Sequence, residues 1–381
     1  MQNGIDRVLI DPDVESMKHA QLALVTNNAA KSAYGQLSRI SLLKKGFNLI
    51  KLFSPEHGIS SKGVDGAAQH DRVDDETGLP VISLYGNSIK PILSDLSNVD
   101  ILLFDIPDIG CRFYTYLWTL TYVMEACAEY GIKLIVLDRP NPNGIDIQKC
   151  EGPYLNEDSC SSFIGRWSIP IRHSCTLGEL ALYFKALKIT SVDLEIISVS
   201  NYSRWSNPFI NISPWTPPSP AIRTQNAAYL YPGLGLLEGI NINEGRGTED
   251  PFTVCGAPFI DSQYVINNLN FEAVKMQPIE YIPSEGLYSG EKCYGIKFTE
   301  IRENHLMPVS LGIQLLQTMI KLYPENIKQR LYKTNVNPSG ANHLDRLIGV
   351  PHSFEKLNNQ YVFEINIQTD WEKKIKPFLI Y

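Results

Sequence analysis

The stretch FNLIKLFSPEHG (residues 47–58) combines the two features that decide the fold. Its first seven residues are largely apolar, which predicts a buried β-strand, and Pro55 ends that strand. Glu56 and His57 follow at the point where the strand stops. Ligands of open α/β sheets bind beyond the carboxyl ends of the strands, so a carboxylate and an imidazole here are well placed for proton transfer. Taken alone, such a pair is more often part of a solvated surface loop.

The same pattern of apolar runs recurs through the first half of the chain. Five further runs predict β-strands at residues 22–27, 81–86, 101–106, 133–138 and 194–199. Helical periodicity marks residues 33–45, 113–130 and 176–187. Gly131 stands where a helix C-terminus is expected, and Thr176 forms a capping box with Glu179. The alternation predicts an α/β fold with a parallel sheet covered on both faces.

The second half of the chain has a different pattern. From about residue 250 it shows short strands, prolines, a helix at 310–322 and a β-like run at 361–365, which predicts a smaller α+β domain. A length of 381 residues fits two domains, and a hydrophobic content of 44% is enough for a core without disulfide or metal support.

Charge and targeting signals narrow the classes of partner. The net charge is −7 and no Lys/Arg cluster is present, which argues against nucleic acid or an anionic membrane as partner. No signal peptide and no membrane-length apolar stretch are seen. We therefore expect no membrane insertion and a cytoplasmic location, or a periplasmic or secreted one if a leader has been removed. The oligomeric state stays open.

Cofactor and metal signatures are missing from the sequence. The seven cysteines are scattered without a Cys-x-x-Cys pair, and no Gly-x-Gly-x-x-Gly, P-loop or Gly-x-Ser-x-Gly motif occurs. The seven histidines lack metal-ligand spacing, although His57, His70 and Asp71 could meet in the fold. We predict an activity with neither a cofactor nor a metal.

Three features suggest where chemistry takes place. Polar residues gather at the expected strand ends, namely Asn27, Glu56, Asp105, Asp108, Asp138 and Arg139. Glu125 is the only charged residue between 113 and 128, so burial would raise its pKa and suit a general acid; alternatively it pairs with a basic group or faces solvent. Arg246, between two glycines, either binds a carboxylate or phosphate or belongs to a solvated turn.

Carboxylates near a cleft, arginines for an acidic substituent and aromatic walls match glycoside hydrolysis. They equally match a protein that binds acid sugars or muropeptides without catalysis, and composition does not separate the two. The Pro- and Ser-rich residues 207–223 are interpreted either as a rigid wall of the binding site or as a linker.

Seven ordered motifs carry a family resemblance. They are FSPEHG (53–58), TGLPVISLYG (77–86), FDIPDIGCRFYTY (104–116), DRPNPNG (138–144), EGP (151–153), PIRH (170–173) and EGRGT (244–248). Together they resemble the NamZ-type exo-β-N-acetylmuramidases. The resemblance implies a glycosidase that releases β-1,4-linked N-acetylmuramic acid from the non-reducing end of peptidoglycan fragments during cell-wall turnover.

The resemblance also implies an architecture and site residues. It implies a Rossmann-like domain (residues 1–235), a C-terminal auxiliary domain (236–381) and a cleft between them. Glu56 is the first choice for a catalytic carboxylate, with Glu125 and Glu238 as candidate partners. The expected substrate-binding residues are His57, Asp105, Arg112, Tyr114, Arg139, Asn141 and Arg246. Among them Arg112, Arg139 or Arg246 is expected to bind the lactyl carboxylate of muramic acid. Tyr114, Tyr116 and Trp215 are expected to line the sugar site.

Overall fold

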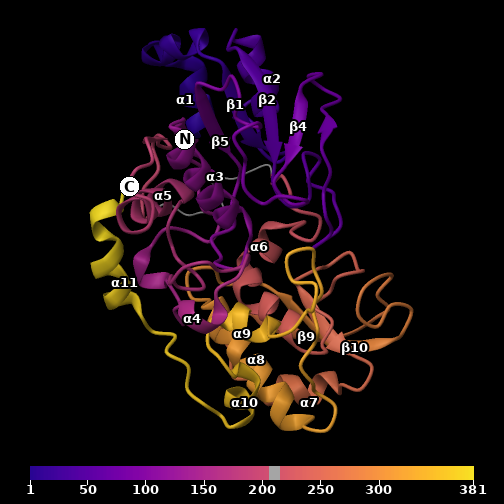
Figure 1. Cartoon of the computed structure of the whole chain (residues 1–381). Coiled ribbons are helices and arrows are strands. Elements are labelled where there is room, and N and C mark those ends of the chain that lie inside the picture. Colours follow the sequence, from indigo (N-terminus) through magenta and orange to yellow (C-terminus); the bar gives the residue numbers. More distant parts are fainter. Residues whose placement is uncertain (206–214) are drawn as a thin grey trace.

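A seven-stranded sheet organises the first half of the computed structural model, which describes residues 1–205 and 215–381 (Figure 1). In spatial order the strands are β3 (Arg72–Val73), β4 (Pro80–Ser83), β2 (Leu49–Ser54), β1 (Leu22–Thr26), β5 (Ile101–Asp105), β6 (Lys133–Leu137) and β7 (Leu194–Ile197). All neighbours pair in parallel except β3 and β4. The six parallel strands follow the 3-2-1-4-5-6 order of Rossmann folds, which confirms the predicted fold class.

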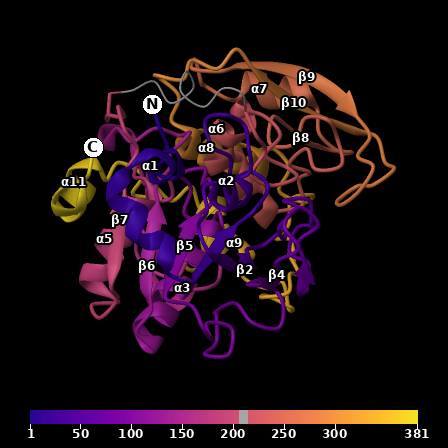
Figure 2. The ribbon, with the colours of Figure 1, turned by 90° about the horizontal axis from the view of Figure 1, so that it is seen from above.

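Helices cover both faces of this sheet, as continuous apolar strands require. In β1, Leu22 and Leu24 pack into the core under α1 (Gly4–Ile10) and α2 (Ser38–Lys44) (Figure 2). The alternate residues, Ala23 and Val25, belong to the core that contains α3 (Tyr116–Tyr130) and α5 (Leu177–Leu187). β1 is therefore buried on both sides, which explains its uninterrupted apolar character.

The predicted helix signals are confirmed in detail. Gly131 ends α3 with a left-handed φ of 70°, and the Thr176–Glu179 capping box opens α5. The helix predicted from residue 113 begins at Tyr116, and the one predicted over 33–45 is shorter, at Ser38–Lys44. The remaining short helices of the first half are η1 (Pro12–His19), η2 (Ile147–Lys149) and α4 (Glu157–Cys160).

The second half is the predicted smaller α+β domain. Its antiparallel sheet has the order β8 (Val254–Ala257), β10 (Cys293–Thr299), β9 (Lys275–Tyr281). α6 (Gln225–Leu234) precedes this domain, and the helices that follow are η3 (Gly235–Gly239), α7 (Ser262–Asn267), α8 (Pro308–Leu322), α9 (His343–Ile348), α10 (Ser353–Asn358), α11 (Gln368–Ile375) and η4 (Lys376–Phe378). The prediction of a strand at 361–365 is wrong. The carbonyl of Ile365 accepts from the amide of Gly152 in a loop, so this segment runs extended without a strand partner.

Buried polar contacts hold the two halves together. The Glu151 carboxylate accepts from the amides of Val309 (3.2 Å) and Ser310 (2.8 Å), the first turn of α8. Arg172 lies 3.9 Å from Glu151 and is as deeply buried. A carboxylate at a helix N-terminus satisfies otherwise unpaired amides and is favoured by the helix dipole. Two of the sequence motifs thus fix α8 against the first domain.

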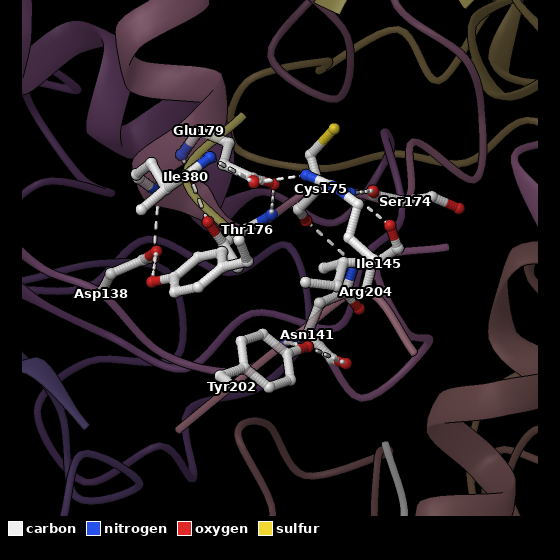
Figure 3. Close-up of polar contacts among 12 residues, drawn as sticks. Asp138, Asn141, Ile145, Ser174, Cys175, Thr176, Glu179, Tyr202, Arg204 and Ile380 are labelled. Carbon is white, nitrogen blue, oxygen red and sulfur yellow. Dashed lines mark hydrogen bonds and ion pairs between the residues drawn. The ribbon is translucent and has the colours of Figure 1, made fainter. Parts of the chain in front are cut away.

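The end of the chain returns to the first domain (Figure 3). The amide of Ile380 donates to Glu179 (3.0 Å), and the hydroxyl of Tyr381 donates to Asp138 (2.7 Å) while accepting from the amide of Val199 (2.8 Å). Burial raises the pKa of Asp138 to about 6. Among the residues described, no helix is both long and apolar enough to cross a membrane.

We predict that Tyr381→Phe lowers the free energy of unfolding by about 1–3 kcal/mol, because Asp138 loses a buried donor. The native pKa of Asp138 lies above the unfolded value, so its contribution to stability falls as the pH rises towards that pKa. Without the Tyr381 hydroxyl, the ionised form of Asp138 is even less stable in the folded protein. Urea unfolding should therefore show a larger deficit at about pH 7.5 than at about pH 5. Tyr34→Phe, at a side chain that is 92% exposed, is the control.

Candidate active site

A pocket lies beyond the carboxyl ends of the sheet strands. Glu56 follows β2, Tyr85 follows β4, and Thr115 lies in the loop between β5 and α3. The second half supplies the opposite wall, including Glu238, Arg246, Phe252, Tyr332, His343 and Arg346. The place of this pocket follows the rule for open α/β sheets.

Glu56 is a buried carboxyl with two hydrogen-bond donors. Its Oε1 accepts from the amide of Gly66 (3.0 Å) and its Oε2 from the hydroxyl of Thr115 (2.8 Å). The side chain is only 6% exposed. Burial raises the pKa of Glu56, while the nearby His57 opposes the rise. A carboxyl that keeps its proton to higher pH is suited to act as a general acid.

The loop after Glu56 is shaped by residues with left-handed backbone. His57 has a φ of 66°, which is uncommon for a residue other than glycine and often marks a functional site. Its Nδ1 donates to the carbonyl of Gly63 (2.8 Å). Gly66 has a φ of 67°, and a Cβ there would lie 2.7 Å from Cγ2 of Thr334. Glycine is therefore needed at residue 66, where the loop supports Glu56.

Asp65 is a second carboxylate, with opposite electrostatics. It accepts from the hydroxyl of Tyr332 and lies 3.2 Å from the guanidinium of Arg246. Burial alone would raise its pKa, but Arg246, His57 and the Tyr332 hydrogen bond together lower the pKa of Asp65. The pKa values of Glu56 and Asp65 are thus shifted in opposite directions, which favours the protonated form of Glu56 and the ionised form of Asp65.

Arg246 is the cation around which the carboxylates of the pocket wall gather. Besides Asp65, it contacts Glu238 (2.9 Å) and Glu244 (3.2 Å), and its guanidinium lies 5.0 Å from the ring of Phe252. The other oxygen of Glu238 lies 3.6 Å from Nε2 of His343. Three carboxylates therefore share one guanidinium.

One ligand-type atom each from Glu56, His57 and Asp65 lies within 4.8 Å of the other two. Such a cluster is compatible with either a cation site or acid–base chemistry. A guanidinium 3.2 Å from Asp65 would repel a bound cation, and Asp65 already accepts from Tyr332. We therefore interpret the cluster as an acid–base site.

Five of the residues singled out from the sequence line this pocket. They are Glu56, His57, Tyr114, Glu238 and Arg246. Tyr114 packs edge-on against Tyr116 (ring centroids 4.8 Å apart) and near Tyr231 (5.8 Å). The pocket therefore has an aromatic wall on the side of the first domain, which suits the face of a sugar ring.

Glu125 does not belong to the pocket. It lies on an outer face of α3, where its side chain is 31% exposed and pairs with Arg166 at 2.6 Å. The alternative considered for this residue, an ion pair with a basic group, is therefore what the structure contains. The spacing of apolar residues around Glu125 suggested burial, but Arg166 comes from a distant loop that the local pattern does not reveal.

Two of the strand-end polar residues bind each other. Asp105 and Arg139 form a buried bidentate pair, with contacts of 2.5 and 3.0 Å. Asn141 donates to the carbonyl of Cys175 (3.0 Å) and accepts from the amide of Asn143. None of these side chains lines the pocket that contains Glu56. Asp105, Arg139 and Asn141 thus make their contacts within the fold and lie outside the pocket of Glu56.

Arg112 is also structural. It is fully buried and donates to the carbonyls of Pro153 (2.7 Å), Ile169 (2.9 Å) and Leu347 (2.8 Å). Burial lowers its pKa to about 10. Among the described residues Arg112 has no carboxylate partner, and it does not line the pocket; it connects the first domain to α9.

Several pocket residues were not found from the sequence. Asp65, Thr115, Tyr332, His343 and Arg346 line the pocket together with the predicted ones. Thr115 belongs to the motif FDIPDIGCRFYTY (104–116), so that motif was the sequence feature that could have identified it. Trp215 lies outside the pocket lining and donates to the carbonyl of Ile222 (3.1 Å). Residues 206–214, part of the proposed wall or linker, lie outside the described residues.

Comparisons with known proteins agree with this architecture. The family described as "Exo-beta-N-acetylmuramidase NamZ, N-terminal" matches residues 22–226, and its C-terminal counterpart matches residues 229–381. The peptidoglycan β-N-acetylmuramidase NamZ of Bacillus subtilis (strain 168) is 36% identical over 99% of this chain and 89% of its own length. The chain therefore belongs to the NamZ family, whose members have two domains.

Solved structures of two similar proteins have the same fold over the whole chain. A DUF1343 family protein from Bacteroides fragilis NCTC 9343 superposes with a TM-score of 0.85 at 26% identity. A second DUF1343 family protein from the same organism gives a TM-score of 0.71 at 27% identity. Each comparison covers 100% of this chain and 98% of the solved one.

Proposed function

We propose that this protein is an exo-β-N-acetylmuramidase that hydrolyses the β-1,4 bond of a terminal N-acetylmuramic acid in peptidoglycan fragments. The carrying observation is a buried Glu56 with a raised pKa close to an Asp65 whose pKa is lowered. Both line the pocket between the two halves of the chain. Family membership and the Bacillus subtilis relative support the substrate class.

Glu56 acts as the general acid. Its proton passes to the glycosidic oxygen as the bond to the leaving sugar breaks, so the leaving group departs as an alcohol. Burial keeps that proton in place up to a higher pH than an exposed glutamate allows. The hydroxyl of Thr115 and the amide of Gly66 hold the carboxyl in position.

Asp65 supplies the negative charge opposite the acid. Arg246 keeps it ionised, so it can stabilise the oxocarbenium-like transition state and act on the attacking water or on the anomeric carbon. Glu238, on the same guanidinium, is the second candidate for this role. We further propose that the domains divide at residue 235, so that one side provides Glu56 and Asp65 and the other Glu238 and Arg246.

Removal of the Thr115 hydroxyl should move the pH profile. A hydrogen bond to the ionised carboxylate lowers the pKa of Glu56, so Thr115→Ala raises it further. Because the acid must be protonated, the alkaline limb of kcat/KM is expected to shift to higher pH. Thr121→Ala, on the helix α3 that follows Thr115 but outside the pocket, should leave the limb in place. A shift to lower pH in Thr115→Ala contradicts Glu56 as the acid.

The proposal is tested with two disaccharides of opposite order. MurNAc-β-1,4-GlcNAc carries the muramyl residue at its non-reducing end, and GlcNAc-β-1,4-MurNAc does not. Mass analysis of the products should show both monosaccharides from the first disaccharide and none from the second. Saturable binding of the first disaccharide without any product would instead establish a binding protein for acid sugars and overturn the proposal.

A further inference from the structure

One basic side chain in the pocket has no partner. Of the residues that the structure describes, two arginines and no lysine line the pocket, namely Arg246 and Arg346. Arg246 is engaged by Asp65, Glu238 and Glu244. Arg346 makes no side-chain hydrogen bond or ion pair with any residue that the structure describes, although it is half-buried. A partly buried guanidinium without an anion is an uncommon arrangement in a protein interior.

The position of Arg346 follows from the way α9 is held. His343, Arg346 and Leu347 stand at i, i+3 and i+4 and share one face of the helix, and all three line the pocket. The ring of His343 stacks on Tyr332 at 4.5 Å, and the carbonyl of Leu347 accepts from Arg112. The helix is thereby fixed with this face towards the pocket.

The acidic neighbour of Arg346 in the sequence is occupied elsewhere. The carboxylate of Asp345 accepts from the amides of His352 (2.9 Å) and Ser353 (2.8 Å) at the start of α10. It therefore caps the next helix and leaves Arg346 unpaired. Asp345 therefore does not neutralise the guanidinium of Arg346, which stays available for a ligand.

An anionic ligand in this pocket requires a cation that is not already paired, as Arg346 is not. Asp65 and Glu238 share Arg246 with Glu244, so an anionic ligand that enters the pocket meets carboxylates whose counter-charge is already shared. Muramic acid differs from glucosamine by a lactyl ether that ends in a carboxylate. A guanidinium is suited to bind that group through two parallel hydrogen bonds.

Resting on the proposed function, we infer that Arg346 binds the lactyl carboxylate and selects muramyl over glucosaminyl residues. The arginines expected for this role from the sequence act otherwise. Arg139 pairs with Asp105, Arg246 balances the carboxylates of the wall, and Arg112 holds the carbonyl of Leu347, next to Arg346. Arg112 is thus a positioning residue for the helix that carries the specificity.

The test compares Arg346→Met with wild type on two fluorogenic glycosides, one of N-acetylmuramic acid and one whose lactyl carboxylate is converted to the carboxamide. We expect the variant to lose roughly 10- to 100-fold in kcat/KM on the carboxylate substrate, mainly through KM. On the carboxamide, variant and wild type should differ little. Arg346→Lys, which keeps the charge but not the planar fork, should recover part of the loss.

Two controls make the outcomes distinct. Arg72→Met, at an exposed side chain paired with Asp75, should behave as wild type on both substrates. An equal loss on both substrates in Arg346→Met would overturn the inference and indicate a structural role. If wild type releases no sugar from either substrate, the proposed function fails. Calorimetric binding of N-acetylmuramic acid to wild type and Arg346→Met then still decides whether Arg346 holds the carboxylate.

Discussion

Replacing Glu56 by Gln is expected to lower kcat on MurNAc-β-1,4-GlcNAc by about 10²- to 10⁴-fold, the usual contribution of a general acid. The amide cannot give a proton to the leaving oxygen, yet it has nearly the same shape. It can still accept the hydrogen bond from either Thr115 or Gly66. The effect should therefore appear in kcat, with the fold and the substrate affinity retained. Initial rates of sugar release measure kcat and KM, and a thermal unfolding curve shows whether the fold is retained.

Glu125→Gln is the matched control for this variant. Glu125 is a glutamate of the same domain, but it pairs with Arg166 on the outside of α3 and does not line the pocket. Its substitution should leave kcat within about a factor of two and stability within about 1 kcal/mol. A loss in Glu125→Gln comparable with that in Glu56→Gln would restore the assignment suggested by the sequence and contradict the site described above.

The second large effect is expected in stability. Arg246→Met removes the guanidinium shared by Asp65, Glu238 and Glu244, and leaves three buried or partly buried carboxylates without it. Breaking a buried ionic network by removing one partner costs about 3–5 kcal/mol. The free energy of unfolding at neutral pH, from urea titration, should fall by that amount. Activity should fall too, because Asp65 is no longer held in its ionised form.

The pH dependence distinguishes this loss from a packing defect. Arg246 lowers the pKa of Asp65, so it stabilises the folded protein where Asp65 is ionised, and this stabilisation disappears as the pH falls through that pKa. The deficit of Arg246→Met should therefore shrink in acid. Arg223→Met, whose exposed pair with Glu249 is worth at most about 1 kcal/mol, is the control. A deficit in Arg246→Met that does not change with pH would argue for lost packing alone.

The parallel sheet was predictable because each strand carries its own signal. Strands such as 101–106 are buried on both faces, so their apolar character is continuous and local. The segment 361–365 has similar local character and yet forms no strand. Its partner would have to come from elsewhere in the fold, and a loop containing Gly152 occupies that place. Pairing is a tertiary property that a single segment does not encode.

The site was predictable only in part, for the same reason. Glu56 stands directly after a strand, so the rule for strand ends was enough to find it. Asp105 also stands at a strand end, but it is neutralised by Arg139, some 34 residues away in the sequence. Asp65 and Arg346 lie in a loop and a short helix without a recognisable pattern. Arg346 reaches the pocket, and Asp65 meets Arg246 and Tyr332, only because the second domain packs over the first.

The central claim, that Glu56 protonates the leaving oxygen, is tested most directly by changing the leaving group. Glu56→Gln and wild type are compared on MurNAc-β-1,4-GlcNAc, whose alcohol needs a proton, and on 2,4-dinitrophenyl-β-MurNAc, whose phenolate does not. The account predicts a loss of about 10²- to 10⁴-fold on the disaccharide and little loss on the dinitrophenyl glycoside. An equally large loss on both substrates would contradict it.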